Sequence, residues 1–332
     1  MSETVFPAGL VPVLLLVLAA EFVNGWTDAP NAIATVVSTR VLTPSVAVGM
    51  ATVLNALGAM SGTAVAATIG KGIVRAEVVD PVTIAAAMLA IVVWSTLAWL
   101  HGLPTSESHA LVAALSGAGL ATAGPDVLLW EGWQKVLVGL GFSSVLGFAG
   151  GFLLLLAISW TFRRTSLGAA RRLFGRLQIC SAAFMAFSHG SNDGQKFIGV
   201  FTLTLVLGGV LPEFRVPLWV ILTCAATMGV GTALGGWRIV HTMGMRVTKL
   251  EPYQGFAAET AAASAIETAT RLGIPVSTTH TINTAIMGVG ATRRFSAVRW
   301  GVGLEIVAAW ILTFPACALI GGLVAFLLRR IF

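Results

Sequence analysis

Two motifs, each occurring twice within long apolar stretches, constrain this chain more than any other feature. The first, N-G-W-T-D-A-P-N at residues 24–31, returns in altered form as H-G-S-N-D-G-Q-K at 189–196. The second, P-T-S-E-S-H at 104–109, returns as P-V-S-T-T-H at 275–280. Polar interruptions at matching places in two halves of a membrane protein are typical of secondary transporters, which bind their substrate at the interface between repeats.

The composition assigns the chain to the membrane. Hydrophobic residues make up 56% of it and charged residues only 10%, whereas a soluble domain carries about 25% charged residues. Several uncharged runs reach the ~20 residues that a spanning helix needs. We therefore predict an all-α polytopic protein of a cell membrane, expected to be a bacterial plasma membrane, with the lipid bilayer as its surroundings.

The order of the motifs divides the chain into two repeats with a basic linker between them. The first repeat is predicted at 1–160, the linker at 161–176 and the second repeat at 177–332. Five arginines occur in the linker, and cytoplasmic loops concentrate Lys and Arg. We expect the linker to face the cytoplasm. The net charge of +6 is explained by such loops, so no nucleic-acid partner is expected.

Each repeat is expected to contain a broken helix and a re-entrant hairpin. The breaks are predicted at 24–31 and 188–196, and the hairpins at 103–123 and 274–291. Irregular backbone at membrane depth survives only against protein or water, which favours an internal site. The predicted fold class is thus two inverted repeats with broken helices and re-entrant helical hairpins, although hydropathy alone leaves three or four crossings per half and the absolute topology open.

The two Pro-Ser turns predict an anion site. Pro104 and Pro275 disfavour helix at the preceding residue and suit the start of a new one, and Ser106 and Ser277 are good N-caps. A helix start exposes unpaired N–H groups and the positive end of the helix dipole, which suits an oxyanion. The alternative is that these hydroxyls only cap helices. The predicted substrate-binding residues are Thr105, Ser106, Ser108, Ser277, Thr278 and Thr279.

The two Asp motifs predict a site for a coupling ion. Carboxylates at membrane depth are costly and face a cavity or a partner. Asp28 and Asp193 could coordinate Na⁺ with nearby amide oxygens, could carry protons, or could cap helices. Lys196 stands where the first copy has Asn31, so its ammonium could replace a coupling cation or contact the anion. The predicted coupling-ion residues are Asn24, Asp28, Asn31, Asn192, Asp193 and Lys196, and no fixed metal site is predicted.

Five further residues are candidates for contact with a proton or the substrate: Glu21, Glu107, His109, His189 and His280. The histidines could equally be packing residues. Glu107 would repel an anion unless it is protonated or bridged by a metal ion, which favours protonation linked to transport or a metal-bearing substrate. The competing interpretation places Glu107 in an aqueous vestibule. Glu267 and Arg271 are spaced for an ion pair on one helix face.

With these residues identified, the chain resembles the Pit family of inorganic phosphate transporters. G-W-T-D-A-P-N at 25–31 resembles that family's G-F-N-D-x-x-N signature, and S-H-G-S-N-D at 188–193 its S-H-G-x-N-D signature. Both Pro-Ser turns resemble its P-x-S-x-x-H elements. The resemblance covers nearly the whole chain. It implies a phosphate symporter with two inverted repeats, a homodimer in some members, phosphate on the hairpin hydroxyls and the coupling ion at the Asp motifs.

Departures from the family pattern bear on ion coupling. Thr27 replaces the usual Asn before Asp28, and G-Q-K at 194–196 resembles the bacterial proton-coupled branch, whose members carry phosphate as a neutral complex with a divalent metal. The loss of an Asn at Lys196 removes an expected sodium ligand. We therefore predict coupling to protons, with metal-phosphate as a candidate cargo; a sodium-coupled symporter and a sulfate permease on the same scaffold are the alternatives.

Other functional classes fit less well. An intramembrane aspartyl protease would need adjacent aspartates, and G-S-N-D at 190–193 lacks the G-x-G-D pattern of such proteases. A serine hydrolase would need a G-x-S-x-G elbow, which this chain lacks. A channel would show flux that is not coupled to an ion gradient. The prediction is a secondary active transporter with alternating access, no enzymatic activity and no cofactor.

Overall fold

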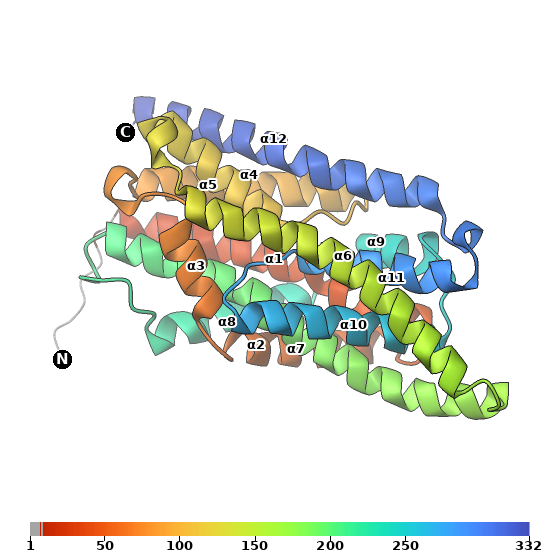
Figure 1. Cartoon of the computed structure of the whole chain (residues 1–332). Helices are drawn as coiled ribbons and strands as arrows, with labels where there is room; N and C mark the ends of the chain where they lie inside the picture. The colour runs from red at the N-terminus through yellow and green to blue at the C-terminus, as the bar shows by residue number, and fades with distance from the viewer. Residues whose placement is uncertain (1–6, 8, 332) are drawn as a thin grey trace.

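The computed structural model describes residue 7 and residues 9–331, and these residues form a bundle of helices (Figure 1). The first six are α1 (Leu10–Ser38), α2 (Pro44–Ala59), α3 (Ala64–Gly72), α4 (Pro81–Leu100), α5 (Glu107–Ala123) and α6 (Trp130–Thr161). The next six are α7 (Leu167–Leu207), α8 (Leu218–Thr232), α9 (Trp237–His241), α10 (Pro252–Arg271), α11 (Thr278–Arg293) and α12 (Trp300–Ile331). Short turns of helix occur at Ala76–Val78, Pro125–Val127, Thr242–Arg246 and Phe295–Ala297.

The two sets of six helices follow the same order. A long helix (α1, α7) precedes a bent pair (α2–α3, α8–α9), then a helical hairpin (α4–α5, α10–α11), then a helix of 32 residues (α6, α12). The contacts between the sets are reciprocal, because α1 packs on α8 as α7 packs on α2, and α5 packs on α12 as α11 packs on α6. The two halves are therefore interlocked.

The expected breaks at 24–31 and 188–196 are wrong, because α1 and α7 are continuous through both segments. Their polar side chains bond to side chains or to their own helix, so the backbone ladder does not need to open. Thr27 Oγ1, for example, donates to the carbonyl of Val23 at 2.9 Å. Pro30 lies inside α1 and removes one N–H donor without ending the helix.

The bends occur instead between the helices that follow. The α2–α3 pair bends by 67° and the α8–α9 pair by 61°. The predicted hairpin turns are where the sequence placed them: α4 and α5 pack together, as do α10 and α11. In both hairpins the second helix begins directly after the Pro-Ser turn.

Four of the described helices, α1, α4, α6 and α12, are long and apolar enough to cross a membrane. The number rises to six if each bent pair counts as one span. Burial separates these helices into two classes, because the most apolar windows of α1 and α4 are 56% buried and those of α6 and α12 only 22%. In Figure 1, α12 runs along the upper edge of the view and α6 crosses its front. These two helices present apolar surface to the bilayer, as a multi-pass membrane protein requires.

Both Asp motifs contain a glycine at a close helix crossing. A Cβ added at Gly25 of α1 would lie 2.3 Å from the carbonyl oxygen of Met228 on α8. A Cβ added at Gly190 of α7 would lie 2.0 Å from the carbonyl oxygen of Asn55 on α2. Glycine is thus needed so that the backbones can touch, and the reciprocal packing of the halves depends on it.

The predicted linker 161–176 is mostly helical. α6 ends at Thr161 and α7 begins at Leu167, with Ser166 capping α7 through the N–H of Ala169. Three of the five arginines therefore project from the first turns of α7, and Arg171 pairs with Glu251 at 2.9 Å. Elsewhere, the ion pair predicted between Glu267 and Arg271 is present, with a distance of 2.9 Å.

Candidate functional site

The two Pro-Ser turns meet inside the protein and start α5 and α11. Ser106 Oγ accepts the backbone N–H of His109, and Ser277 Oγ accepts that of His280, so both predicted N-caps are present. Each cap leaves the N–H groups of the next residues without an intrahelical acceptor. The turns touch, because Ser108 Oγ donates to the carbonyl of Val276 at 2.8 Å. Two helix starts are therefore brought to one place.

The aspartates of α1 and α7 lie against the second of these helix starts. Thr278 Oγ1 donates to Asp193 at 2.9 Å, and Thr279 Oγ1 donates to Asp28 at 3.3 Å. Asn31 donates to both threonine hydroxyls, at 3.3 and 3.0 Å. Residues from three elements far apart in the sequence thus form one network, and the hydroxyls predicted for the anion contact the carboxylates predicted for the cation.

Lys196 links the second aspartate to the first hairpin. Its ammonium forms a buried ion pair with Asp193, one helical turn away on α7. The same nitrogen donates to Ser108 Oγ at 2.5 Å and to the carbonyl of Val276 at 3.0 Å. The side chain is fully buried, so its charge depends on these partners.

Glu107 is buried beside α1 and does not line a vestibule. Its exposed fraction is 1%, and its Oε1 accepts a hydrogen bond from Thr27 at 3.0 Å. In this conformation the competing interpretation of Glu107 as a vestibule residue is wrong. Further along α1, Glu21 accepts a hydrogen bond from Asn24 at 3.0 Å, so these two predicted residues contact each other.

The predicted histidines divide into two groups. His189 lies at the centre, where its Nε2 is 3.5 Å from a carboxylate oxygen of Asp193 and 4.0 Å from one of Asp28. The ligand atoms of these three residues lie within 4.8 Å of one another, which is compact enough for a metal ion. His109 and His280 instead pack edge to face at 4.4 Å, behind the helix starts.

Asn192 supports the second hairpin from α7. Its side-chain nitrogen donates to Thr270 Oγ1 at 2.8 Å and to the carbonyl of Ile274 at 3.4 Å, while its oxygen accepts the N–H of Val276 at 3.3 Å. These contacts hold the backbone of the Pro-Ser turn. Asn192 therefore positions the turn and does not face the aspartates.

Three residues outside the predicted set complete the surroundings of the site. Trp310 stacks on His280 with ring centroids 3.6 Å apart and donates to the carbonyl of Pro104 at 2.9 Å. Asn55 Oδ1 lies 3.0 Å from His189 Nδ1. Thr27 donates to Glu107. Asn55 could have been found from the sequence, because it is a polar residue in an apolar helix. Trp310 could not, because tryptophan is common in membrane helices.

All seventeen predicted residues are buried, with exposed fractions of at most 5%. The site is therefore occluded. Four carboxylates, Glu21, Asp28, Glu107 and Asp193, are among these residues, and in the described part of the chain the only lysine ammonium buried with them is that of Lys196. Buried charges persist only when they are compensated. The carboxylates beyond the one paired with Lys196 need protons or a bound cation, which ties occupancy of this site to a cation.

Comparison with known proteins supports the same assignment. The model of the phosphate transporter family (PHO4) matches residues 24–172 and 167–321. A probable low-affinity inorganic phosphate transporter of Rhizobium meliloti is 47% identical over 319 residues, covering 96% of both chains. A protein of the same description from Bacillus subtilis is 39% identical over 323 residues, covering 96% of this chain and 97% of the other.

A solved structure described as the sodium-dependent phosphate transporter superposes with a TM-score of 0.90 and 26% identity. It covers 97% of this chain and 99% of its own. Two helix starts, paired intramembrane aspartates and matches along nearly the whole sequence lead to one conclusion: this multi-pass membrane protein belongs to the phosphate transporter family and is not an enzyme.

Proposed function

We propose that the protein is a secondary active symporter of inorganic phosphate that works by alternating access and is coupled to protons. The observation that carries the proposal is the charge balance of the occluded site, where four buried carboxylates accompany one buried ammonium. A dianionic substrate adds to this excess of negative charge. Entry of the anion therefore requires that cations enter with it.

The hairpin hydroxyls and helix starts are proposed to hold phosphate. Thr278, Thr279 and Ser108 donate to carboxylates or to a carbonyl in the occluded site, and rotation of these hydroxyls would present the same donors to an oxyanion. Free N–H groups after the Ser106 and Ser277 caps add the helix-dipole contribution. The substrate would replace the carboxylates as acceptor once those are neutralised by protons or a metal ion.

Lys196 favours the proton over sodium as the coupling ion. Its ammonium already contacts Asp193 and Ser108, so a metal cation at that place would meet like charge. Asp28 has no such ammonium beside it. A divalent metal that travels with phosphate would be held by Asp28, His189 and the carboxylate oxygen of Asp193 that is not paired with Lys196.

Sodium coupling is the second candidate, because the structural relative with TM-score 0.90 is described as sodium-dependent. The chain keeps Asp28 and Asn31 in contact with the threonines of α11, which supplies oxygen ligands on the first-repeat side. Proton coupling and sodium coupling assign different roles to Lys196: in the first its ammonium replaces a coupling cation, and in the second it does not. The two candidates therefore predict a different ion dependence of uptake for the same substrate.

One experiment decides between these candidates. Uptake of labelled phosphate into proteoliposomes is measured under an inward proton gradient, an inward Na⁺ gradient, and with or without Mg²⁺. Uptake driven by the proton gradient and independent of Na⁺ supports the proposal; uptake that needs Na⁺ at constant pH replaces it with the sodium candidate. Excess unlabelled sulfate is the specificity control, and sulfate uptake unaffected by phosphate would assign a sulfate permease.

The division into two inverted repeats, 1–160 and 177–332, also forms part of the proposal. It is supported by the repeated helix order and by the two separate matches of the family model. Cysteines introduced at the α6–α7 turn should then be labelled from the cytoplasmic side only. The homodimer expected from the family resemblance would appear as twice the chain mass of 34.5 kDa for the protein in nanodiscs.

A further inference from the structure

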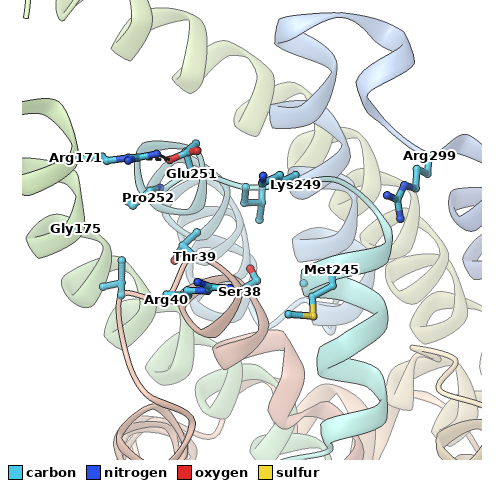
Figure 2. A pocket seen from close by; sticks show the side chains of 13 residues that line it. Ser38, Thr39, Arg40, Arg171, Gly175, Met245, Lys249, Glu251, Pro252 and Arg299 are labelled. Carbon is cyan, nitrogen blue, oxygen red and sulfur yellow. Dashed lines mark hydrogen bonds and ion pairs between the residues drawn. The ribbon is translucent and has the colours of Figure 1, made fainter. Parts of the chain in front are cut away.

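A second polar cavity lies outside the occluded site, at the end of the molecule where α1 and α6 end. It has a volume of about 780 Å³, within the range of small-molecule sites. The end of α1, the start of α7, the segment before α10 and the turn before α12 form its walls. Four cationic side chains and one carboxylate line it: Arg40, Arg171, Lys249, Arg299 and Glu251 (Figure 2). We call this cavity the basic pocket.

Three of the four cations of the basic pocket are uncompensated. Arg171 is bound to Glu251, its Nε and Nη2 both donating to the same carboxylate oxygen at 3.2 and 2.9 Å. Within the described part of the chain, Arg40, Lys249 and Arg299 form no ion pair. Figure 2 shows that they come from separate segments around the cavity. The lining therefore carries an excess of three positive charges.

The backbone at Arg40 adopts a conformation that favours glycine. Arg40 has φ of 60°, the one positive value among described residues other than glycine. The corresponding turn after α7 uses Gly209, with φ of 69°. The two turns share their hydrogen bonds, from Arg40 N–H to Val37 and from Gly209 N–H to Val206, each at 3.0 Å. Because glycine suits this conformation, an arginine at this position costs conformational energy and places a guanidinium at the cavity wall.

A chain of hydrogen bonds runs from the basic pocket toward the occluded site and ends at Thr35 of α1, one helical turn from Asn31. Thr39, which lines the pocket, donates to Gln178 Oε1 at 2.9 Å. Gln178 Nε2 donates to the buried carboxylate of Glu259 at 3.0 Å, and Thr35 donates to the same oxygen at 2.5 Å. Asn31 of the occluded site lies one turn before Thr35, on the same face of the helix.

The other side of the site is enclosed differently. Beyond Lys196 on α7, Val200, Leu203 and Leu205 belong to the hydrophobic core that includes the start of α1. The buried hydroxyl of Thr204 donates to the carbonyl of Val200 within its own helix. Beside His189, hydrogen bonds continue through Asn55 to Thr232, which is fully buried. The chain of hydrogen bonds through Gln178 is the one that leads toward the basic pocket.

We propose that the basic pocket is a second, outer binding site for an anion that carries a phosphate group, at the end of α1 that leads from the occluded site. Guanidinium groups from separate walls suit tetrahedral oxyanions, and Ser38 and Thr39 add hydroxyl donors. A cationic cavity concentrates such anions. Two ligands share this chemistry: free phosphate and a phospholipid headgroup. If the ligand is free phosphate, the inference rests on the proposed function.

The pocket offers a local probe for the test. Met245 lines it with an exposed fraction of 58%, so Met245→Cys in a Cys180→Ser background places one reactive thiol there; Cys224 and Cys317 are buried. Labelling rates are measured with an anionic and a cationic methanethiosulfonate, with and without inorganic phosphate. The protein is studied full-length in detergent, and then in vesicles of phosphatidylcholine with or without phosphatidylglycerol.

The charge-removed variant combines Arg40→Gln, Lys249→Gln and Arg299→Gln. Its matched control, Arg164→Gln, Arg172→Gln and Arg176→Gln, removes the same charge from exposed positions near the start of α7 that do not line the cavity. The anionic reagent should react about tenfold faster than the cationic one in the unchanged pocket and in the control, and this preference should disappear in the charge-removed variant.

Phosphate should slow both reagents in the unchanged pocket and in the control, and not in the charge-removed variant. If phosphatidylglycerol vesicles alone give this protection, the pocket is again a phosphate-group site and the occupant is a lipid. Equal rates and equal protection in the charge-removed variant and its control overturn the inference. Uptake is measured in parallel, so that failure of transport with intact protection refutes the proposed function and leaves the pocket standing.

Discussion

The two aspartates of the site occupy equivalent places in the two halves but have different partners. Asp28 accepts a hydrogen bond from Thr279 and has an amide, Asn31, one turn later. Asp193 accepts a hydrogen bond from Thr278 and has an ammonium, Lys196, one turn later. The two motifs therefore share an aspartate and differ one turn later, where the carboxylate of Asp193 is paired with an ammonium and that of Asp28 is not.

The two halves of the site therefore share a helix order but differ in the charge next to the aspartate. A fully symmetric site would hold two equal cation positions. In the proposed mechanism the ammonium of Lys196 occupies the second position, and the first is left for an exchangeable ion. The hairpins add to the asymmetry, because Glu107 in the first hairpin corresponds to Thr278 in the second.

The comparison between the two aspartates is tested most strongly by replacing them, because these substitutions are expected to have the largest effects on uptake and stability. Asp193→Asn should abolish gradient-driven uptake and also destabilise the protein by about 3–5 kcal/mol, because the buried ammonium of Lys196 loses its partner. Asp28→Asn should abolish uptake with a much smaller loss of stability, because no ammonium depends on Asp28. Uptake in proteoliposomes and thermal unfolding in detergent measure both quantities.

The double variant Asp193→Asn, Lys196→Met is the control for this prediction. It removes the uncompensated charge and should recover most of the lost stability without recovering transport. Equal destabilisation by Asp28→Asn and Asp193→Asn would show that the ion pair does not distinguish the two halves. Full uptake in both single variants would remove the aspartates from the mechanism.

The next largest effect is expected from making the two halves alike. Lys196→Asn gives the second motif the residue found at position 31 and leaves the carboxylate of Asp193 without an ammonium. Such a carboxylate requires a cation, so uptake driven by a proton gradient should fall and a dependence on Na⁺ should appear. Ion dependence of phosphate uptake is the measurement, and an unchanged ion profile would contradict a coupling role for Lys196.

A smaller effect is expected at the hairpin hydroxyls. Thr278→Ala removes one donor to a buried anion, and hydrogen bonds to charged groups contribute about 1.5–3 kcal/mol each, so the apparent KM for phosphate should rise about tenfold or more. Thr284→Ala, on the same helix with its hydroxyl bonded to backbone carbonyls, is the control. A KM that stays the same in Thr278→Ala would place the anion elsewhere.

The smallest effect is expected at the glycines of the two helix crossings, a feature that both halves share. Gly25→Ala and Gly190→Ala each press a methyl group against a backbone carbonyl across a helix crossing, and overpacking of this kind costs about 1–3 kcal/mol. The two losses of stability should be similar, since the crossings are reciprocal. Gly141→Ala, where an added Cβ meets no atom within 4 Å, serves as the control. A large difference between the stability losses of Gly25→Ala and Gly190→Ala would show that the two helix crossings are not equivalent in packing.

Much of the site could be predicted because its residues break strong compositional rules. Asp28, Asp193 and Lys196 are charges at membrane depth, and the Ser106 and Ser277 caps follow from local chemistry at a Pro-Ser turn. These signals depend on a few neighbouring residues. The polar path through Thr35, Gln178 and Glu259 escaped prediction, because it joins three helices and each residue alone is unremarkable.

The location of the helix breaks shows the same limit. Clusters of polar residues at 24–31 and 188–196 suggested open backbone, whereas the side chains find partners on other helices and α1 and α7 stay intact. The bends fall at α2–α3 and α8–α9. Hydropathy cannot separate a polar helix face from a polar break, since the difference depends on whether acceptors lie opposite.

The sequence by itself determined the class of the protein, its doubled motifs, the candidate site residues and the starts of the hairpin helices, because each follows from composition or from contacts within a turn of chain. Only the tertiary structure decided that the hydroxyls of α11 face the aspartates of α1 and α7, that Lys196 pairs with Asp193 and reaches the opposite hairpin, and that a basic pocket lies beyond the end of α1. Those facts depend on how helices distant in sequence pack, and packing is a property of the whole fold.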